Sequence, residues 1–165
     1  MKNRIKDLIN CLIVEKCLYE KAIELSEAKK EIIMKNDFLK LDSIVEKETS
    51  LINDIKKIEQ KRDKLCSEIS EYLGIDGQKA TLSDIIEKAD DVQCKNRLRQ
   101  LLDEFGSIIK TYRDLNDTNK NLIEKTLQYI EFMLEKVLKQ DNNVTYGKEV
   151  NSGVVQEINI FDQRV

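Results

Sequence analysis

The sequence predicts an all-α fold: an elongated antiparallel three-helix, coiled-coil-like bundle with one short connecting helix and a mobile C-terminal tail. Two features of the composition favour it. The 165-residue chain has no proline, and 36% of its residues are charged while 5% are aromatic. This composition favours long amphipathic helices over a compact mixed fold with a thick core. The third observation is a helical spacing of apolar residues along most of the chain.

The first helix is expected over residues 2–35, where the apolar residues recur at helical spacing. They are Ile5, Leu8, Leu12, Leu18, Ala22, Leu25 and Ile32. Asn36 and Asp37 then supply turn and N-cap chemistry, so a second helix is expected to follow.

The second helix is expected over residues 38–73. Alternate steps of three and four residues from Leu41 to Tyr72 give a heptad seam whose only polar members are Glu48 and Arg62. The helix should end before Gly74, because glycine is the residue expected at a helix C-cap.

A short helix is expected over residues 82–88, since Thr81 and Asp84 have the spacing of a capping box. The third long helix is expected over residues 91–140. Its seam runs from Cys94 to Lys136 and is apolar as far as Asn119, its first polar member.

Three asparagines interrupt this third long helix, although asparagine is a below-average helix former. They are Asn116, Asn119 and Asn121. Asn119 falls on the seam, where a single polar residue fixes the register of packed helices at some cost in stability. Asn116 and Asn121 lie off the seam and should contribute polar surface beside it.

The helix lengths do not match. Two helices of about 35 residues and one of about 50 residues leave an overshoot of about 15 residues, which begins near Thr126. The overshoot is rich in large apolar residues: Leu127, Tyr129, Ile130, Phe132, Met133, Leu134, Val137 and Leu138. Another protein is expected to cover them, because each large apolar side chain left in water forgoes roughly 1.5–3 kcal/mol. Alternatively, a kink among the asparagines folds the segment back as a fourth bundle helix, or two chains pair through it.

Several classes of protein are disfavoured. A net charge of −3 with dispersed basic residues gives no sign of nucleic-acid binding. No apolar run approaches the roughly 20 residues of a membrane span, and no signal peptide is recognisable, so a cytoplasmic location is expected. The four cysteines form no CxxC pair and are expected to stay reduced. The chain has no histidine, which removes the usual nucleophile and metal-site chemistry, so neither an enzyme nor a cofactor is expected.

The expected C-terminal tail, residues 141–165, holds four asparagines and two glycines. It should be mobile. Its apolar stretch VVQEINIF, residues 154–161, is open to two interpretations, a short strand or an apolar patch in a disordered end.

The run Arg113-Asp114-Leu115-Asn116-x-x-Asn119-x-x-Leu122-Ile123-Glu124 resembles the motif in the third helix of the FlgN family of flagellar export chaperones. The order of features is also similar to that family. These features are an N-terminal helical hairpin, the TLSDII segment before the long helix, the Tyr146-Gly147 pair after a polar spacer, and the ending FDQRV.

The resemblance implies an ATP-independent cytosolic chaperone of type III flagellar secretion. It would bind the hook-associated proteins FlgK and FlgL through their C-terminal helical regions and bring them to the export-gate protein FlhA. Docking on FlhA is implied for Tyr146 with Gly147. Client recognition is implied for the C-terminal helical region, with the candidate residues Leu115, Asn119, Leu122, Ile123, Thr126, Leu127, Tyr129, Ile130, Met133, Leu134, Val137 and Leu138.

Two further possibilities stay open at this point. One is a structural coiled-coil homodimer or a general flagellar export adaptor, in which the helix end is a dimer seam. The other concerns regulation, because residues 154–161 could fold back onto the client site when it is empty.

Overall fold

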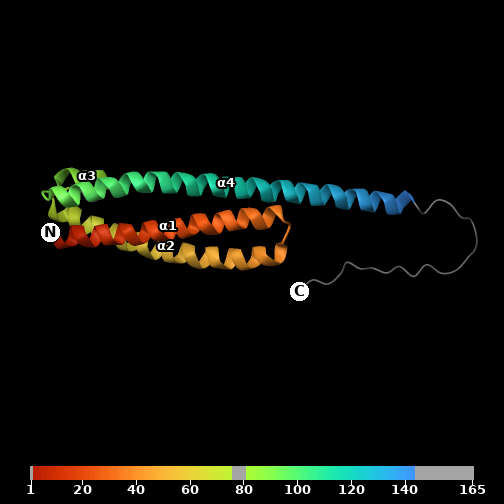
Figure 1. Cartoon of the computed structure of the whole chain (residues 1–165), viewed down its shortest axis with the longest axis horizontal. Coiled ribbons are helices and arrows are strands. Elements are labelled where there is room, and N and C mark those ends of the chain that lie inside the picture. Colours follow the sequence, from red (N-terminus) through yellow and green to blue (C-terminus); the bar gives the residue numbers. More distant parts are fainter. Residues whose placement is uncertain (1, 76–80, 144–165) are drawn as a thin grey trace, which may run out of the picture. The chain divides into compact units, whose positions relative to one another are not determined.

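A computed structural model of the chain describes residues 2–75 and 81–143. Four α-helices account for nearly all of them, and these residues include no strand: α1 is Lys2–Met34, α2 is Phe38–Tyr72, α3 is Leu82–Lys88 and α4 is Val92–Asn143 (Figure 1). The all-α class is therefore confirmed. The chain divides into two compact units, residues 1–126 (unit 1) and residues 127–165 (unit 2).

Helix α4 is a single helix through Asn116, Asn119 and Asn121, which contradicts a kink at the asparagines. It also continues to Asn143, beyond the expected end at residue 140. The rest of the expected tail, with Tyr146, Gly147 and residues 154–161, lies outside the described residues.

The turn between α1 and α2 is made by Asn36 and Asp37. Asn36 has a φ of 54°, in the left-handed region that asparagine tolerates better than most residues. The Asn36 N–H donates to the Ile33 carbonyl and the Asp37 N–H to the Ile32 carbonyl, a Schellman pattern. The Asp37 carboxylate then accepts from the Lys40 N–H at 3.3 Å and caps α2. Two short residues thus end one helix and start the next.

The predicted caps at Gly74 and at Thr81 are both present. Gly74, at a φ of 62°, ends α2, and the following Ile75 N–H donates to the Ser70 carbonyl at 2.9 Å. Thr81 and Asp84 form a reciprocal capping box at the start of α3. The Asp91 carboxylate accepts from the Gln93 and Cys94 N–H groups at the start of α4.

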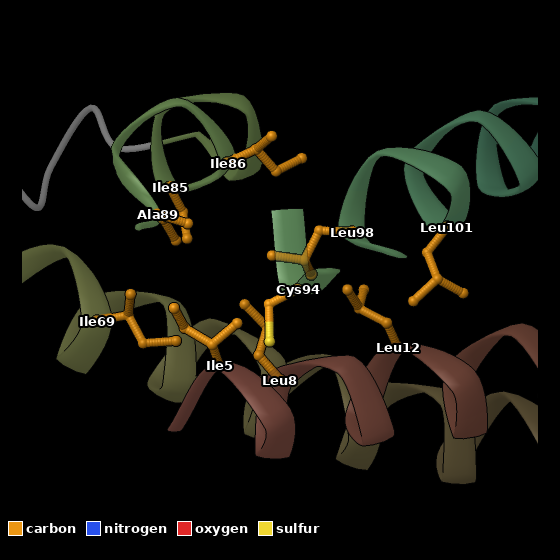
Figure 2. Close-up of a cluster of buried hydrophobic side chains, with 10 residues drawn as sticks. All are labelled: Ile5, Leu8, Leu12, Ile69, Ile85, Ile86, Ala89, Cys94, Leu98 and Leu101. Carbon is orange, nitrogen blue, oxygen red and sulfur yellow. The ribbon is translucent and has the colours of Figure 1, made fainter. Parts of the chain in front are cut away.

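The buried core of unit 1 lies where α3 and the start of α4 meet the hairpin of α1 and α2 (Figure 2). All four helices contribute to it, with Ile5, Leu8, Leu12, Ile69, Ile85, Ile86, Ala89, Cys94, Leu98 and Leu101. The short helix α3 thus closes this end of unit 1 by turning Ile85 and Ile86 onto the hairpin. Each large side chain buried there contributes roughly 1.5–3 kcal/mol.

Interhelical contacts give the directions of the helices in unit 1. Glu15 pairs with Arg62 and Lys29 with Glu48, so residue numbers rise along α1 while they fall along α2. Lys16 pairs with Glu104 and Ser26 bonds to Asn119, so numbers rise together along α1 and α4. In unit 1, α2 is therefore antiparallel to α1, and α4 is parallel to α1.

Candidate protein-binding surface

Burial along α4 follows the predicted seam in unit 1. Leu98 and Leu101 are fully buried, and farther along the helix Asn119 is 1% exposed. The seam members between them, from Phe105 to Leu115, are half-buried, and so are Leu122 and Thr126. In unit 2, every described side chain from Leu127 to Lys139 is exposed. The character of the helix surface therefore changes at the junction of the two units.

The two polar residues of the α2 seam both form ion pairs with α1. The Glu48 carboxylate lies 2.6 Å from the Lys29 ammonium. The Arg62 guanidinium donates to Glu15, whose side chain is 1% exposed. Burial raises the pKa of the Glu15 carboxyl, and the nearby Arg62 charge opposes that rise. These pairs let charged residues occupy a packed seam, and they fix the register of α1 against α2.

Asn119 joins α4 to α1 in the interior of unit 1. Its side-chain amide donates to the Ser26 backbone carbonyl at 2.8 Å. The Ser26 hydroxyl in turn donates to the Asn116 amide oxygen at 3.3 Å. Asn116 was expected to contribute polar surface beside the seam. Its side chain instead takes part in the contact between α1 and α4. Asn121 is exposed, as expected.

An aromatic contact joins α1, α2 and α4. The Tyr19 ring of α1 packs edge-on against Phe105 and Tyr112 of α4, with centroids 6.3 and 5.9 Å away. Its hydroxyl donates to the Glu59 carboxylate of α2 at 3.0 Å. Burial and this hydrogen bond raise the pKa of Tyr19 to about 12. These contacts hold the helices of unit 1 together beyond the buried core, which lies where α3 and the start of α4 meet the hairpin.

The predicted client-binding residues divide between the two units. Asn119 is buried in unit 1, where Leu115, Leu122, Ile123 and Thr126 are half-buried. The other seven are exposed in unit 2, and we call them the apolar face of unit 2: Leu127, Tyr129, Ile130, Met133, Leu134, Val137 and Leu138. Their exposed fractions run from 37% for Ile130 to 64% for Leu138.

Helical geometry places these seven side chains together. At about 100° per residue they span roughly half of the circumference of α4, with Tyr129 at one edge, Leu138 at the other and Ile130 near the centre. Phe132 falls on the opposite side, where the Lys136 ammonium lies 5.4 Å from the centre of its ring. Glu135 and Lys139 form an ion pair on that side, at 3.4 Å. The side opposite the apolar face of unit 2 therefore carries charged groups, with Phe132 as its one large apolar residue, and we call it the polar back.

Charged residues border the apolar face of unit 2 on both edges. By the same geometry Lys136 follows Tyr129 around the helix, and Glu131 follows Leu138. Both are exposed. One edge is therefore basic and the other acidic.

The sequence prediction missed an exposed apolar group at the turn of the α1–α2 hairpin. Met34, Phe38 and Leu39 are 65%, 52% and 89% exposed. Phe38 is the first residue of α2 and lies before the predicted seam, which starts at Leu41. Its position in the first turn beside the Asp37 cap is the signal that could have indicated exposure, because a helix end has fewer neighbours to cover it.

A hollow of about 530 Å³ lies between α1 and α2. Leu25 and Leu51 form its apolar part, and the charged or polar residues Lys21, Glu24, Lys47, Ser50 and Asp54 complete it. It therefore offers much less apolar surface than the apolar face of unit 2.

The cysteines and the acidic residues were the remaining candidates for a reactive or metal-binding site. Cys11 and Cys94 are buried, Cys66 is half-buried and Cys17 is exposed, all as free thiols. Burial raises the pKa of Cys66 to about 11, which keeps its thiol protonated at neutral pH. Within residues 2–75 and 81–143, no three Cys, Asp or Glu side chains come together to hold a metal ion. No described helix has an apolar stretch of the length and hydropathy that a bilayer requires.

The chain matches a known protein family and a curated relative. The family model described as FlgN protein matches residues 1–152. A curated relative, "Uncharacterized protein YvyG" of Bacillus subtilis (strain 168), is 26% identical over 149 residues, which cover 89% of this chain and 90% of the relative. No solved structure matches the chain.

Proposed function

The chain belongs to the FlgN family of flagellar export chaperones, and we propose from this premise that it is a cytosolic chaperone for the hook-associated proteins FlgK and FlgL. In this proposal it binds their C-terminal helical regions, prevents their premature assembly and delivers them to the export-gate protein FlhA. FlgN is a family of chaperones and not of enzymes, so the proposed activity consists of binding and release.

The observation that carries the proposal is the apolar face of unit 2. Eight large apolar side chains are exposed within twelve consecutive residues of one helix, and seven of them share one face. Monomeric proteins rarely expose a contiguous apolar patch unless it is a binding site. A helix with such a face suits the packing of another amphipathic helix, which needs only burial of apolar surface and no nucleotide. Met133 also suits a surface that adapts to more than one client.

We narrow the set of residues proposed to touch the client by how exposed their side chains are. Asn119 already bonds to Ser26 inside unit 1. Leu115, Leu122, Ile123 and Thr126 are half-buried in unit 1, so they have less surface to offer. We therefore propose the apolar face of unit 2 as the main contact. The proposed docking of Tyr146 and Gly147 on FlhA rests on the family resemblance alone.

The test uses the full chain and purified FlgK from the same bacterium. Ile130→Asp and Met133→Asp each place a carboxylate at the centre of the proposed contact, where an unpaired buried charge costs several kcal/mol. We expect the dissociation constant in titration calorimetry to rise about a hundredfold or more. Gln128→Asp is the matched control, because it adds the same charge on the polar back of the helix. If Ile130→Asp and Met133→Asp bind FlgK as tightly as Gln128→Asp does, the site is elsewhere.

The competing function is a structural homodimer in which the apolar face of unit 2 is a seam between two copies. Sedimentation equilibrium of the chain without client distinguishes the homodimer from the chaperone. A monomer at every concentration rejects the obligate dimer. A dimer that Ile130→Asp dissociates, with no binding of FlgK or FlgL, would replace the chaperone proposal.

A further inference from the structure

The apolar face of unit 2 is wider than the contact of a simple helix pair. A helix that packs against one other helix uses two positions in seven, or about three or four in twelve. Here seven of the twelve residues from Leu127 to Leu138 belong to the face. A single partner helix laid along Ile130 and Met133 would leave either Tyr129 or Leu138 at the edges in water.

The same helix shows in unit 1 what covers such a surface. Leu98 and Leu101 of α4 are 0% exposed. They belong to a cluster that contains Leu8 of α1 and Ile69 of α2 (Figure 2). More than one helix therefore buries the α4 seam in unit 1, because α1, α2 and α3 all contribute side chains to this cluster.

We infer that the partner of the apolar face of unit 2 supplies two helical segments, which lie side by side and straddle α4. The inference rests on the proposed function, in that the partner is the client named there. One segment covers the edge at Tyr129 and the other covers the edge at Leu138. More than one helix would then cover the apolar face of unit 2, as more than one helix covers the α4 seam in unit 1.

Charge distinguishes the two segments. Lys136 borders the edge at Tyr129, and Glu131 borders the edge at Leu138. The segment beside Lys136 carries acidic side chains, and the segment beside Glu131 carries basic ones, because opposite charges at the rim of a contact select the register. A second copy of this chain fits less well, since it brings one such helix and leaves about half of each apolar face exposed.

Site-specific photocrosslinking tests the inference on the full chain. A benzophenone amino acid replaces Tyr129 in one variant and Leu138 in another, with Gln128 on the polar back as the control position. Each variant is mixed with purified FlgK, and then with purified FlgL, before irradiation and peptide mapping. We expect the two edge positions to label two separate segments of the client, and the control position to label neither.

The outcomes separate the inference from the function on which it rests. Labels from both edges on one helical turn of the client overturn the two-segment inference while the client site stands. A client that binds without labelling from either edge also overturns the inference and leaves the chaperone proposal intact. Failure of the unmodified chain to bind FlgK or FlgL overturns both. Labelling of a second copy in place of the client favours the homodimer.

Rim charges give an independent readout. Lys136→Glu and Glu131→Lys should each weaken client binding by about twofold to fivefold, the size expected of exposed ion pairs. Glu135→Lys and Lys139→Glu, on the polar back, are the matched controls. They should change the affinity for the client less. If Lys136→Glu has the same effect as Lys139→Glu, and Glu131→Lys the same effect as Glu135→Lys, only net charge matters and the assignment of the two edges is overturned.

Discussion

The side-chain amide of Asn119 in α4 donates to the backbone carbonyl of Ser26 in α1 across 2.8 Å, in the interior of unit 1. The Asn119 amide oxygen is also buried, and no described protein atom donates to it. A helix carbonyl such as that of Ser26 already accepts from its own helix, so the added bond fixes the alignment of α4 on α1 more than it adds stability. Asn119 is thus a positioning residue of the bundle.

Replacing Asn119 with leucine tests this role. Asn119→Leu removes one unsatisfied buried acceptor and adds apolar burial, so we expect the free energy of unfolding in urea to rise by about 1 kcal/mol. Asn119→Asp buries a charge and should lower the free energy of unfolding by several kcal/mol. Asn121→Leu is the exposed control and should stay within about 0.5 kcal/mol of the parent chain. A loss of stability in Asn119→Leu would mean that the asparagine is a net stabiliser.

The sequence predicted the helices well because their ends have chemical signatures. Gly74 and the Thr81/Asp84 box are local features, and local features can be read without the fold. The partners of Arg62 and Glu48 could not be read in this way. They depend on how α1 is aligned against α2, which is set by the turn at Asn36 and by packing along the whole hairpin.

The candidate surface was predicted only in part for a similar reason. The apolar spacing of α4 continues past Thr126 without a break, so periodicity alone does not tell a buried seam from an exposed one. The comparison of helix lengths predicted where the exposed part of α4 begins, near Thr126. The predicted client residues already leave out Phe132, which lies on the opposite side of α4.

Tyr19 should make the stability of unit 1 depend on alkaline pH. Its pKa is raised from an ordinary 10 to about 12, so the folded protein keeps the phenol protonated while the unfolded chain ionises it. Stability from this group is complete below pH 10 and is lost as the pH rises toward 12. We expect Tyr19→Phe to have a smaller decline in stability over that range. The difference in ultraviolet absorbance between the two proteins reports the ionisation itself, and a midpoint near 10 would contradict the packing described for Tyr19.

The four cysteines should differ in reactivity. Cys17 is exposed, whereas Cys11 and Cys94 are buried. Cys66 has a pKa of about 11, so at pH 7 only about one molecule in ten thousand carries its thiolate. We expect a maleimide to add one label quickly to the native chain and four in urea, as counted by mass spectrometry. Cys17→Ser should lose the fast label, and rapid labelling of Cys94 would contradict its place in the core.

The Glu15–Arg62 pair should show how a charge in the α1–α2 seam is tolerated. Removing Arg62 alone, as Arg62→Met, leaves the buried Glu15 carboxylate without its cation, and we expect a loss of about 3–5 kcal/mol at pH 7. The double variant Glu15→Leu with Arg62→Met should recover most of that loss, because neither charge is then buried.

The pH dependence of Arg62→Met gives the sharper check. Arg62 holds down a Glu15 pKa that burial raises, so its removal raises that pKa further. Such a carboxyl has a higher pKa in the folded protein than in the unfolded chain. Its contribution to stability is complete below the unfolded pKa and is lost as the pH rises through the folded pKa. The deficit of Arg62→Met relative to the parent chain should therefore shrink as the pH is lowered from 7 toward 4.5. Lys57→Met, which removes an exposed partner of Asp54, should show no comparable change. A deficit of constant size would mean that Arg62 acts through the packing of its aliphatic stem and not through its charge.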